Sequence, residues 1–466
     1  MDAAVQSLIK DHFDSIKATS FKLRNSTAGE RKKKLRKLEK WILQNRSEIQ
    51  NAVYQDLQKP SQETDITEIF VVLSEIRLAC KKLKSWSSNR PVQSSLPFFG
   101  TIAYVHHEPK GACLIISPWN YPFQLAIAPL VSAIAAGNAV IIKPSEFSEN
   151  TSRLIHKMCK EVFDKEEVAV VLGDKDESKE LLQFPFDHIF FTGSPQVGKL
   201  VMEAAAKNLT SVTLELGGKS PTIVDQTANI KDAAKKIAWG KWQNAGQICI
   251  APDYLFAHEE VYEELIDELS LQSDRIYGKK ENYGGIISRS HHQRINDLMV
   301  DAIEKGANIG FGGKSDKKNL RFTPTLLTGI SQNSRVLDEE IFGPILPILK
   351  FRKLDEVIDF INKKPKPLAL YIFSKNKKNI DLIQRKTSSG MLTINDTVLQ
   401  FGHPHLPIGG VNNSGIGKSH GHAGFLAFTN EKAVLKQPSS VTITKTIYPP
   451  YSRIKKFIIE MLVKYF

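Results

Sequence analysis

The chain has 466 residues, of which 41% are apolar and 24% charged, and its formal net charge at pH 7 is +13. These values predict an ordinary soluble globular protein, long enough for two or three domains. The cysteines are scattered with no C-x-x-C spacing, which argues against a disulfide framework or a thiolate zinc site and favours a reducing, cytoplasmic setting. They are Cys80, Cys113, Cys159 and Cys249.

The N-terminus has no apolar core of signal-peptide length, so we expect no export signal. The longest apolar run, 123–136, is interrupted by Pro129 and is too short to cross a bilayer, which predicts a buried helix. Residues 1–90 read as helices. Aliphatic residues recur near helical spacing through and beyond the basic run at 31–37. The run therefore predicts the solvent-exposed face of an amphipathic helix rather than a nucleic-acid site.

A strand is expected at 99–106, as part of a protruding hairpin. Beyond residue 110 short apolar runs alternate with amphipathic segments, which predicts a mostly parallel sheet covered by helices, with ligands at the carboxyl ends of its strands. The expected strands are 112–116, 139–142, 167–171, 187–191 and 211–214. The expected helices between them are 123–136, 148–163, 176–183 and 195–207.

A second α/β stretch follows at about 230–425. Its expected helices are 230–243, 259–273, 290–305, 354–363 and 376–386. The tail after residue 447 turns at two prolines and predicts a short basic amphipathic helix. This helix is suited to a weak peripheral contact with a membrane surface, and equally to packing on the chain's own substrate opening or on a partner subunit.

Cys249 stands on a short turn between a helical run and a strand-like run, at Asn244-Ala245-Gly246-Gln247-Ile248-Cys249. We interpret it as a catalytic nucleophile. A thiolate attacks carbonyl carbon well but is scarce at neutral pH, so the chain must also supply a base and an oxyanion-binding group. Inert packing is the structural alternative.

Two upstream residues could supply those groups. Asn120 lies in a loop fixed by prolines on both sides and could present its amide to a developing oxyanion, although asparagine also favours turns. Glu215 lies between two leucines at the end of an expected strand, and apolar surroundings raise a carboxyl pKa toward neutrality. Before Gly217 and Gly218 such a glutamate could also be purely structural.

Two further segments suggest a dinucleotide site. At residues 187–199 a strand, a turn at Gly193 and a helix start capped by Ser194 form a helix N-terminus that suits a pyrophosphate. A capped structural helix is the alternative, because the G-x-G-x-x-G pattern is absent. Glu146 at the end of an earlier strand could receive ribose hydroxyls, while Lys143 could tolerate a 2′-phosphate. NAD is therefore the expected cofactor, with NADP left open.

Together these segments resemble the aldehyde dehydrogenases, specifically the class 3 or fatty-aldehyde type. The matching segments follow the family's order over about residues 30–440. They are PWNYP at 118–122, KPSE at 143–146, FTGSPQVGK at 191–199, LELGGKSP at 214–221, NAGQICIAPDY at 244–254, EEIFGPILPI at 339–348 and LPIGGVNNSGIGKSHG at 406–421.

The resemblance implies an α/β subunit in three parts with a C-terminal amphipathic tail, and a homodimer. The parts are an NAD(P)-binding domain at 1–86 and 108–214, a catalytic domain at 215–425, and a small β bridging element at 87–107 and 426–446, with the tail at 447–466. By the same resemblance each site residue has a role. Cys249 is the nucleophile, Glu215 the base and Asn120 the oxyanion donor; Lys143 and Glu146 hold the adenosine ribose, Ser194 the pyrophosphate, and Glu340 and Phe342 the nicotinamide half.

The expected reaction is NAD(P)-dependent oxidation of an aldehyde to a carboxylate through a cysteine thiohemiacetal and thioester. Departures from the family pattern at Ala245, Ile248 and Ile408 leave the reaction intact but bear on the substrate's shape. The expected pocket walls point to medium or long aliphatic, or aromatic, aldehydes. They are Tyr121, Trp242, Phe401 and Ile408.

Two other functions compete with this one. A cysteine hydrolase or acyltransferase would share the thiol, base and oxyanion donor without a nicotinamide. A protein that binds anionic surfaces would explain the charge and the basic tail, but not the ordered motifs. The histidine pairs at 403/405 and 420/422 lack an accompanying thiolate or carboxylate cluster, so we expect no metal.

Overall fold

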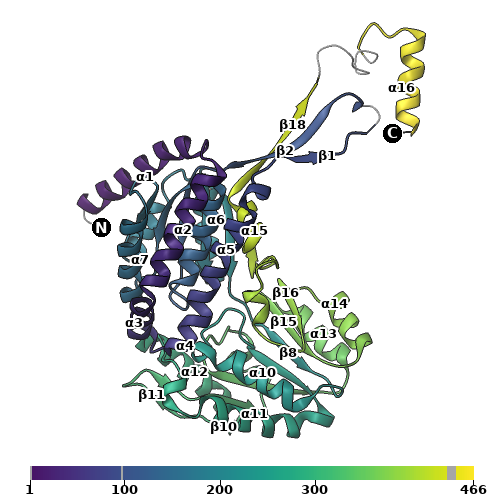
Figure 1. Ribbon diagram of the computed structural model, residues 1–466. Coiled ribbons are helices and arrows are strands. Elements are labelled where there is room, and N and C mark those ends of the chain that lie inside the picture. Colours follow the sequence, from purple (N-terminus) through teal and green to yellow (C-terminus); the bar gives the residue numbers. More distant parts are fainter. Residues whose placement is uncertain (1–2, 96–97, 438–447, 466) are drawn as a thin grey trace.

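A computed structural model describes residues 3–95, 98–437 and 448–465 of the chain (Figure 1). Two α/β layers, each built on its own β-sheet, form the body. A narrow arm of three strands leads from the body to a single helix at its tip. The α/β class expected from the sequence is confirmed.

The chain begins with helices that pack against the first sheet. They are α1 (Ala3–Leu23), α2 (Ala28–Gln44), α3 (Arg46–Leu57), α4 (Ser61–Thr64), a π-helical turn (Asp65–Ile69) and α5 (Phe70–Trp86). On α2 Leu35 and Leu38 are buried while most of the basic side chains lie at the surface, which confirms the amphipathic interpretation. Arg31 is the exception, because it is buried and its Nη1 donates to the Ala135 carbonyl at 3.2 Å.

The first sheet has six strands in the order β17-β7-β6-β3-β4-β5, all parallel except β17. Its strands are β3 (Ala112–Ile116), β4 (Ala139–Lys143), β5 (Val168–Val170), β6 (His188–Gly193), β7 (Ser211–Leu216) and β17 (Gly415–Ile416). The connecting helices are α6 (Gln124–Ala136), α7 (Glu149–Val162), α8 (Lys175–Leu181) and α9 (Pro195–Ala206). Each strand and helix expected between 112 and 207 is confirmed to within two residues. α6 is buried along its whole length because it is apolar on every side.

The second sheet has seven strands in the order β10-β13-β14-β9-β8-β15-β16, parallel except for β10. Its strands are β8 (Pro221–Val224), β9 (Tyr254–His258), β10 (Asn308–Phe311), β13 (Thr325–Thr328), β14 (Ile345–Phe351), β15 (Ala369–Phe373) and β16 (Met391–Ile394). Its helices are α10 (Ile230–Trp242), α11 (Tyr262–Tyr277), α12 (Arg289–Glu304), α13 (Leu354–Lys363) and α14 (Lys377–Lys386). The helix expected at 259–273 starts later, at Tyr262, because a 3₁₀ turn at Glu259–Val261 precedes it.

The arm is an antiparallel sheet of β1 (Arg90–Val92), β2 (Ile102–Pro109) and β18 (Thr429–Lys436), with β2 in the centre (Figure 1). The protruding hairpin is thus confirmed, but the strand expected at 99–106 starts three residues later. Gly100 has a φ of 86° and the Thr101 N–H bonds back to the Phe98 carbonyl, so a turn occupies that position. Residues 438–446 of the expected bridging element lie outside the described residues.

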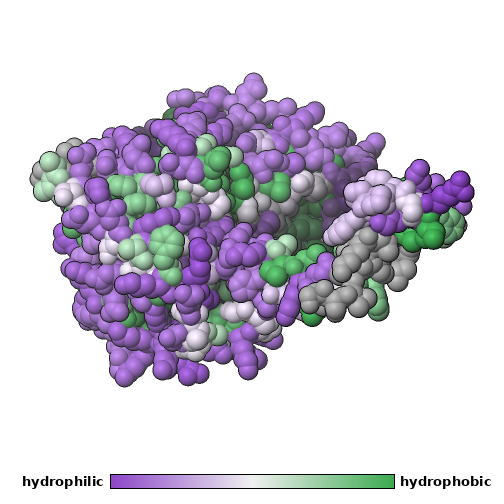
Figure 2. Space-filling model, turned by 90° about the horizontal axis from the view of Figure 1, so that it is seen from above, coloured by the Kyte–Doolittle hydropathy of each residue, from purple (hydrophilic) through white to green (hydrophobic). Residues whose placement is uncertain are grey.

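A small hairpin and two helices complete the described chain. They are β11 (Ser315–Asp316), β12 (Arg321–Phe322), α15 (Gly421–Ala427) and α16 (Arg453–Tyr465). α16 lies at the tip of the arm, away from the body (Figure 1), and the protruding end of the molecule carries hydrophobic beside hydrophilic surface (Figure 2). Phe457, Met461 and Leu462 of α16 line one hollow. None of the helices in the described ranges is long and apolar enough to cross a membrane.

Candidate active site

The carboxyl ends of four parallel strands bring predicted site residues to one edge of the first sheet. Glu215 is the penultimate residue of β7, β6 ends at Gly193, and β4 ends at Lys143. The loop that follows β3 carries Asn120. Parallel neighbours end at the same edge, so residues far apart in the sequence become neighbours in space.

Cys249 reaches this edge from the second layer on a tightly wound segment between α10 and β9. Asn244, Ala245 and Gly246 have φ values of 50°, 52° and 75°, so three successive residues are left-handed. A Cβ at Gly246 would lie 2.3 Å from the Gly343 carbonyl oxygen, which explains why glycine is required there. The turn between a helix and a strand expected around Cys249 is confirmed.

Two cavities meet at Cys249, and Leu125 also lines both. The larger has a volume of about 450 Å³ and mainly apolar walls, whereas the smaller measures about 230 Å³ and carries several polar groups. Ile66 and Phe70 line the larger cavity and are 60% and 55% exposed, so its mouth is apolar as well. A reactive sulfur thus lies where an apolar channel meets a polar one.

Two of the four residues expected to form the pocket walls line the larger cavity. Tyr121 and Phe401 line it, but Trp242 and Ile408 do not. Trp242 is fully buried in the core of the second layer, where its Nε1 donates to the Ser273 hydroxyl at 2.8 Å. One helical turn earlier Trp239 points into the cavity instead. Ile408 packs behind the wall and is 1% exposed.

The smaller cavity gathers most of the expected catalytic and cofactor residues. Its walls include Asn120, Gly193, Ser194, Glu215, Cys249, Glu340 and Phe342. Lys143 and Glu146 lie outside these walls. Lys143 is buried, with its Nζ donating to the carbonyls of Pro144 at 2.9 Å and Gly173 at 2.8 Å, and Glu146 is exposed.

Burial and negative charge oppose ionisation of the sulfur. Burial raises the pKa of the Cys249 thiol above its usual range, and the charges of Glu340 and Glu215 raise it further. Hydrogen bonds from the backbone N–H groups of Cys249 and Ile250 act in the opposite direction. At neutral pH the sulfur therefore rests as a thiol, which must lose its proton before it can attack.

Glu215 has the properties of a general base for a water molecule. Burial raises the pKa of its carboxyl to about 7, while a hydrogen bond from Ser419 Oγ to Oε1 and the positive charge of Lys418 oppose the shift. The carboxyl therefore exchanges a proton readily at neutral pH. This is the raised pKa that the two flanking leucines predict.

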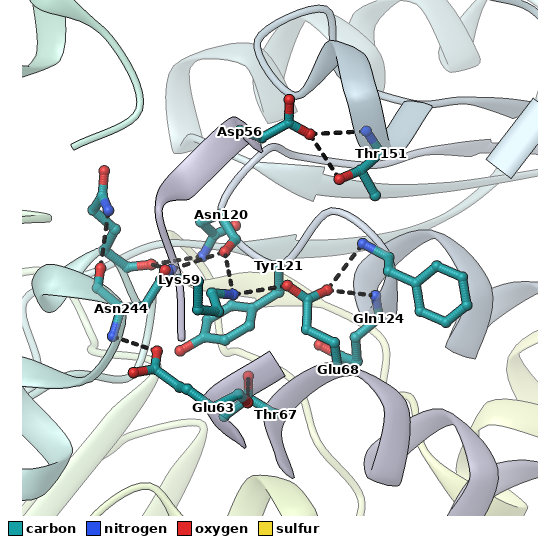
Figure 3. A network of polar contacts seen from close by, with 12 residues as sticks. Asp56, Lys59, Glu63, Thr67, Glu68, Asn120, Tyr121, Gln124, Thr151 and Asn244 are labelled. Atoms are coloured by element: carbon teal, nitrogen blue, oxygen red, sulfur yellow. Dashed lines mark hydrogen bonds and ion pairs between the residues drawn. The ribbon is translucent and has the colours of Figure 1, made fainter. Parts of the chain in front are cut away.

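Asn120 is held by backbone contacts from the segment that carries the nucleophile. Its Nδ2 donates to the Gln247 carbonyl at 3.0 Å, which leaves a second amide hydrogen for a ligand. The Asn244 amide donates to the Asn120 carbonyl at 2.8 Å. The Asn244 N–H in turn donates to Glu63 Oε1 at 2.8 Å, so the two loops form one unit (Figure 3).

A buried ion pair supports this unit from the N-terminal helices. Lys59 Nζ lies 2.7 Å from Glu68 Oε1 and also donates to the Asn120 carbonyl at 3.3 Å (Figure 3). Both charged side chains are 0% exposed. The second oxygen of Glu68 accepts the N–H groups of Phe123 and Gln124, at 2.9 and 3.0 Å. Glu68 lies in the π-helical turn, a local widening that is common at functional sites.

Sequence reasoning missed this ion pair because its partners lie in a helical region without a motif. A signal was nevertheless present. Thr64, Glu68, Val72, Glu75 and Leu83 recur at helical spacing and are all buried, so two acids interrupt an otherwise apolar helix face. Buried carboxylates of this kind are rare unless they are paired or functional. Arg294 and His291, which line the smaller cavity, were also missed.

The smaller cavity fits the nicotinamide half of a dinucleotide. Glu340 Oε1 is buried and finds no hydrogen-bond partner among the described residues, so it can accept from a ribose hydroxyl. Burial raises the pKa of this carboxyl to about 8. Ser194 caps α9, with its Oγ accepting the Val197 N–H at 3.3 Å, and the remaining free N–H groups of that turn suit a phosphate.

The fold and the site together define an α/β oxidoreductase with a cysteine nucleophile beside a dinucleotide cavity. Residues 2–434 match the aldehyde dehydrogenase family. The chain is 45% identical to a 4,4'-diaponeurosporen-aldehyde dehydrogenase of Staphylococcus aureus, over 92% of this chain and 93% of that protein. It is 41% identical to a dimeric NADP-preferring aldehyde dehydrogenase of Canis lupus familiaris, over 89% and 92% of the two chains.

A solved structure shows the same arrangement. The structure described as the substrate-bound state of Staphylococcus aureus AldH is 43% identical to this chain, which it matches with a TM-score of 0.94 over 97% of this chain and 99% of that one. The chain belongs to the aldehyde dehydrogenase family and is an oxidoreductase that oxidises aldehydes. These matches favour an aldehyde dehydrogenase over the two alternatives, a cysteine hydrolase and a protein that binds anionic surfaces.

We predict that loss of the Lys59 charge slows acylation of the sulfur. Lys59→Met leaves Glu68 unpaired, so we expect a loss of about 3–5 kcal/mol in the free energy of unfolding. The double variant Lys59→Met/Glu68→Gln removes the stranded charge while keeping an acceptor for the N–H groups of α6. It should recover stability but still form NADH about 100-fold more slowly, because the Asn120 loop is misplaced. Chemical denaturation and stopped-flow absorbance would measure the two effects.

Lys157→Met is the matched control, because this lysine pairs with Glu48 on the surface, where both side chains are about half exposed. An exposed pair contributes little to stability, so neither measurement should change beyond about 1 kcal/mol or twofold. A double variant with wild-type NADH formation would contradict a role for Lys59 in holding Asn120.

Proposed function

We propose that the protein oxidises medium or long-chain aliphatic, or aromatic, aldehydes to carboxylates, with Cys249 as the nucleophile. The apolar cavity that ends at Cys249 carries this proposal. Its walls include Tyr121, Leu125 and Val398, and its mouth is apolar. The relative named as a 4,4'-diaponeurosporen-aldehyde dehydrogenase supports an aldehyde as the substrate.

In the proposed reaction the Cys249 thiol loses its proton to solvent, and Sγ then attacks the aldehyde carbon. The Asn120 amide and the Cys249 N–H stabilise the resulting oxyanion. The dinucleotide, when bound, accepts the hydride that leaves this thiohemiacetal. Glu215 then deprotonates a water that hydrolyses the thioester, and the carboxylate departs. Three residues from three separate segments thus perform both half-reactions.

We propose NAD as the cofactor, with NADP also accepted. Glu340, Phe342, Gly193 and Ser194 line the cavity that would hold its nicotinamide and phosphate parts. Lys143 and Glu146 would hold the adenosine ribose from the end of β4. The relative described as NADP-preferring supports NADP as an alternative.

We also propose a homodimer in the cytoplasm, joined through the arm. Ile102 and Leu435 of the arm are 56% and 57% exposed, and β1 and β18 are the edge strands of the arm sheet as far as the structure describes it. Such edges pair readily with another chain. The name of the dimeric relative points the same way, and the four free cysteines suit a reducing compartment. α16 would add a weak contact with anionic membrane surfaces.

The nucleophile and base are tested by comparing two variants. We expect Cys249→Ala to form no NADH from an aldehyde. We expect Glu215→Gln to release a burst of NADH equal to the enzyme concentration and then to stall, because the thioester accumulates. In the wild type the rate of thioester hydrolysis should rise with pH through about 7, as the Glu215 carboxyl ionises. Rapid-quench mass spectrometry would detect the acylated Cys249.

NADH formation by Cys249→Ala would refute the nucleophile, and steady turnover without a burst in Glu215→Gln would refute the base. Asn120→Ala serves as an intermediate case: loss of one oxyanion donor should slow turnover on the order of 100 to 1,000-fold without unfolding the protein.

The substrate class is tested with straight-chain aldehydes of increasing length, each with NAD and with NADP. Burial of each methylene contributes about 0.8 kcal/mol, so kcat/KM should rise roughly fourfold per carbon until the cavity is full. Val71→Phe narrows the cavity and should lower kcat/KM for long aldehydes while sparing short ones. Leu209→Phe, at a site that is 93% exposed, is the control. A flat dependence on chain length would contradict the proposal.

The arm and α16 are separated by a truncation that removes residues 448–466. We expect both forms to sediment as dimers, because the arm sheet remains. The full chain should bind vesicles containing anionic lipid at low salt, because α16 combines exposed Phe457 and Val463 with a basic last turn. The truncated form should lose this binding. Unchanged binding after truncation would exclude α16, and a monomeric full chain would exclude the dimer.

A further inference from the structure

A third cavity, of about 10 Å³, lies next to Glu215 and belongs to neither channel. One water molecule needs about this much space. The cavity is closed by apolar side chains and by a small set of polar ones. The polar residues that line it are Glu75, Gln124, Ser132, Glu215, Ser419 and His420.

Two buried polar atoms around this cavity have no partner among the described residues. They are Gln124 Nε2 and His420 Nε2, on side chains that are 1% and 7% exposed. Burying such groups without a hydrogen bond is costly, so their presence points to a water molecule between them. The cavity therefore has the size and the polar lining that a single water molecule requires.

The tautomer of His420 leaves its Nε2 free to accept a hydrogen bond from a water molecule in this cavity. Ser419 Oγ donates to Glu215 and lies 2.9 Å from His420 Nδ1, so Nδ1 carries the hydrogen and donates to the hydroxyl oxygen. Burial lowers the pKa of His420 to about 4, so the ring is neutral and its Nε2 is an acceptor. A water here can accept from Gln124, donate to His420, and use its second hydrogen toward a carboxylate.

Glu75 is the second carboxyl on this cavity, and the proposed reaction leaves it without a role. It lies on α5, is 4% exposed, and its Oε2 accepts the Gly421 N–H at 2.8 Å. Burial raises the pKa of Glu75 to about 7, opposed by that N–H, which matches the value for Glu215. The groups facing it are the Gly421 N–H and neutral His420 from the α15 side, and Gln124 and Ser132 from α6. Among the residues that the structure describes, no lysine or arginine lines the cavity.

We propose that Glu75 receives the proton that Glu215 takes from the hydrolytic water, through the water held in this cavity, while Ser419 orients Glu215. The hydrolytic water loses a proton to Glu215 as its oxygen bonds to the thioester carbon, and the carbon–sulfur bond then breaks, which releases the product acid and returns Cys249 as a thiolate. Protonated Glu215 then gives a proton to the cavity water, which releases another to a Glu75 oxygen. Glu215 is thereby ionised again while the product leaves, and no oxidant or further reactant is needed.

Glu75 acts through Glu215 and does not touch the substrate, so it is a positioning and relay residue rather than a catalytic one. The proposal rests on the proposed role of Glu215 as base. Its distinguishing consequence is that Glu75 affects thioester hydrolysis but not the formation of the thioester. A purely structural role in holding Gly421 would affect both steps.

The test is Glu75→Gln, which keeps an oxygen to accept the Gly421 N–H but cannot take a proton. We expect an unchanged burst of NADH in rate and amplitude, a steady-state rate about tenfold lower, and a larger solvent deuterium isotope effect on that rate, because proton transfer becomes limiting. Glu75→Asp should recover part of the rate, and Ser419→Ala should also slow hydrolysis without changing the burst. Glu167→Gln, at a glutamate that pairs with Lys34 far from the cavity, should change nothing.

Wild-type turnover and isotope effect in Glu75→Gln would overturn the relay. If Glu75→Gln slows the burst and the steady-state rate equally, Glu75 has only a structural role, and the proposed relay is overturned as well. If Glu215→Gln shows no accumulated thioester, the proposed base fails by itself, whatever Glu75→Gln shows. Melting temperatures of all variants would identify any that fail to fold.

Discussion

The buried ion pair between Lys59 and Glu68 is the contact on which the geometry of the site depends. Removing two charges from water costs free energy. The attraction within an isolated buried ion pair rarely offsets this desolvation penalty. Here Glu68 also accepts the first free N–H groups of α6, a helix that has no side-chain cap of its own. Lys59 holds the Asn120 carbonyl. The pair thus fixes both the start of α6 and the loop before it, and its cost is offset by contacts that orient the oxyanion donor.

Buried carboxyl groups in and behind the site impose a second cost. Burial raises the pKa of Glu63 and Glu215 to about 7 and that of Glu340 to about 8. Because the folded chain holds these protons more tightly than the unfolded chain, their contribution to stability is complete below the ordinary carboxyl pKa. It is lost as pH rises toward 7 to 8. The site is therefore least stable where the proposed base is ionised, a conflict typical of functional residues.

The sequence predicted most of the first layer and the core of the site. Alternating apolar runs predict parallel strands, and parallel strands bring their ends together, so Glu215, Gly193 and Asn120 follow from local patterns. Trp242 failed because Trp239 and Trp242 lie one turn apart on α10, and no local pattern says which of the two reaches the cavity and which is buried in the core. Lys59 and Glu75 were missed because the backbone groups that they hold, the Asn120 carbonyl and the Gly421 N–H, lie in distant segments. Long-range partners of buried charges are decided by packing.

Ile248 and Ile250 flank Cys249 and both line the apolar cavity, so the sulfur has hydrophobic neighbours on the substrate side. Water enters such a channel poorly, and an acyl chain that fills it excludes water altogether. On the proposed mechanism the hydrolytic water must then arrive from the polar cavity, which Glu215 and Glu340 both line. The same cavity would hold the nicotinamide, so hydride transfer and hydrolysis cannot share it at one moment. A water site behind Glu215 lets the base release its proton without using either channel.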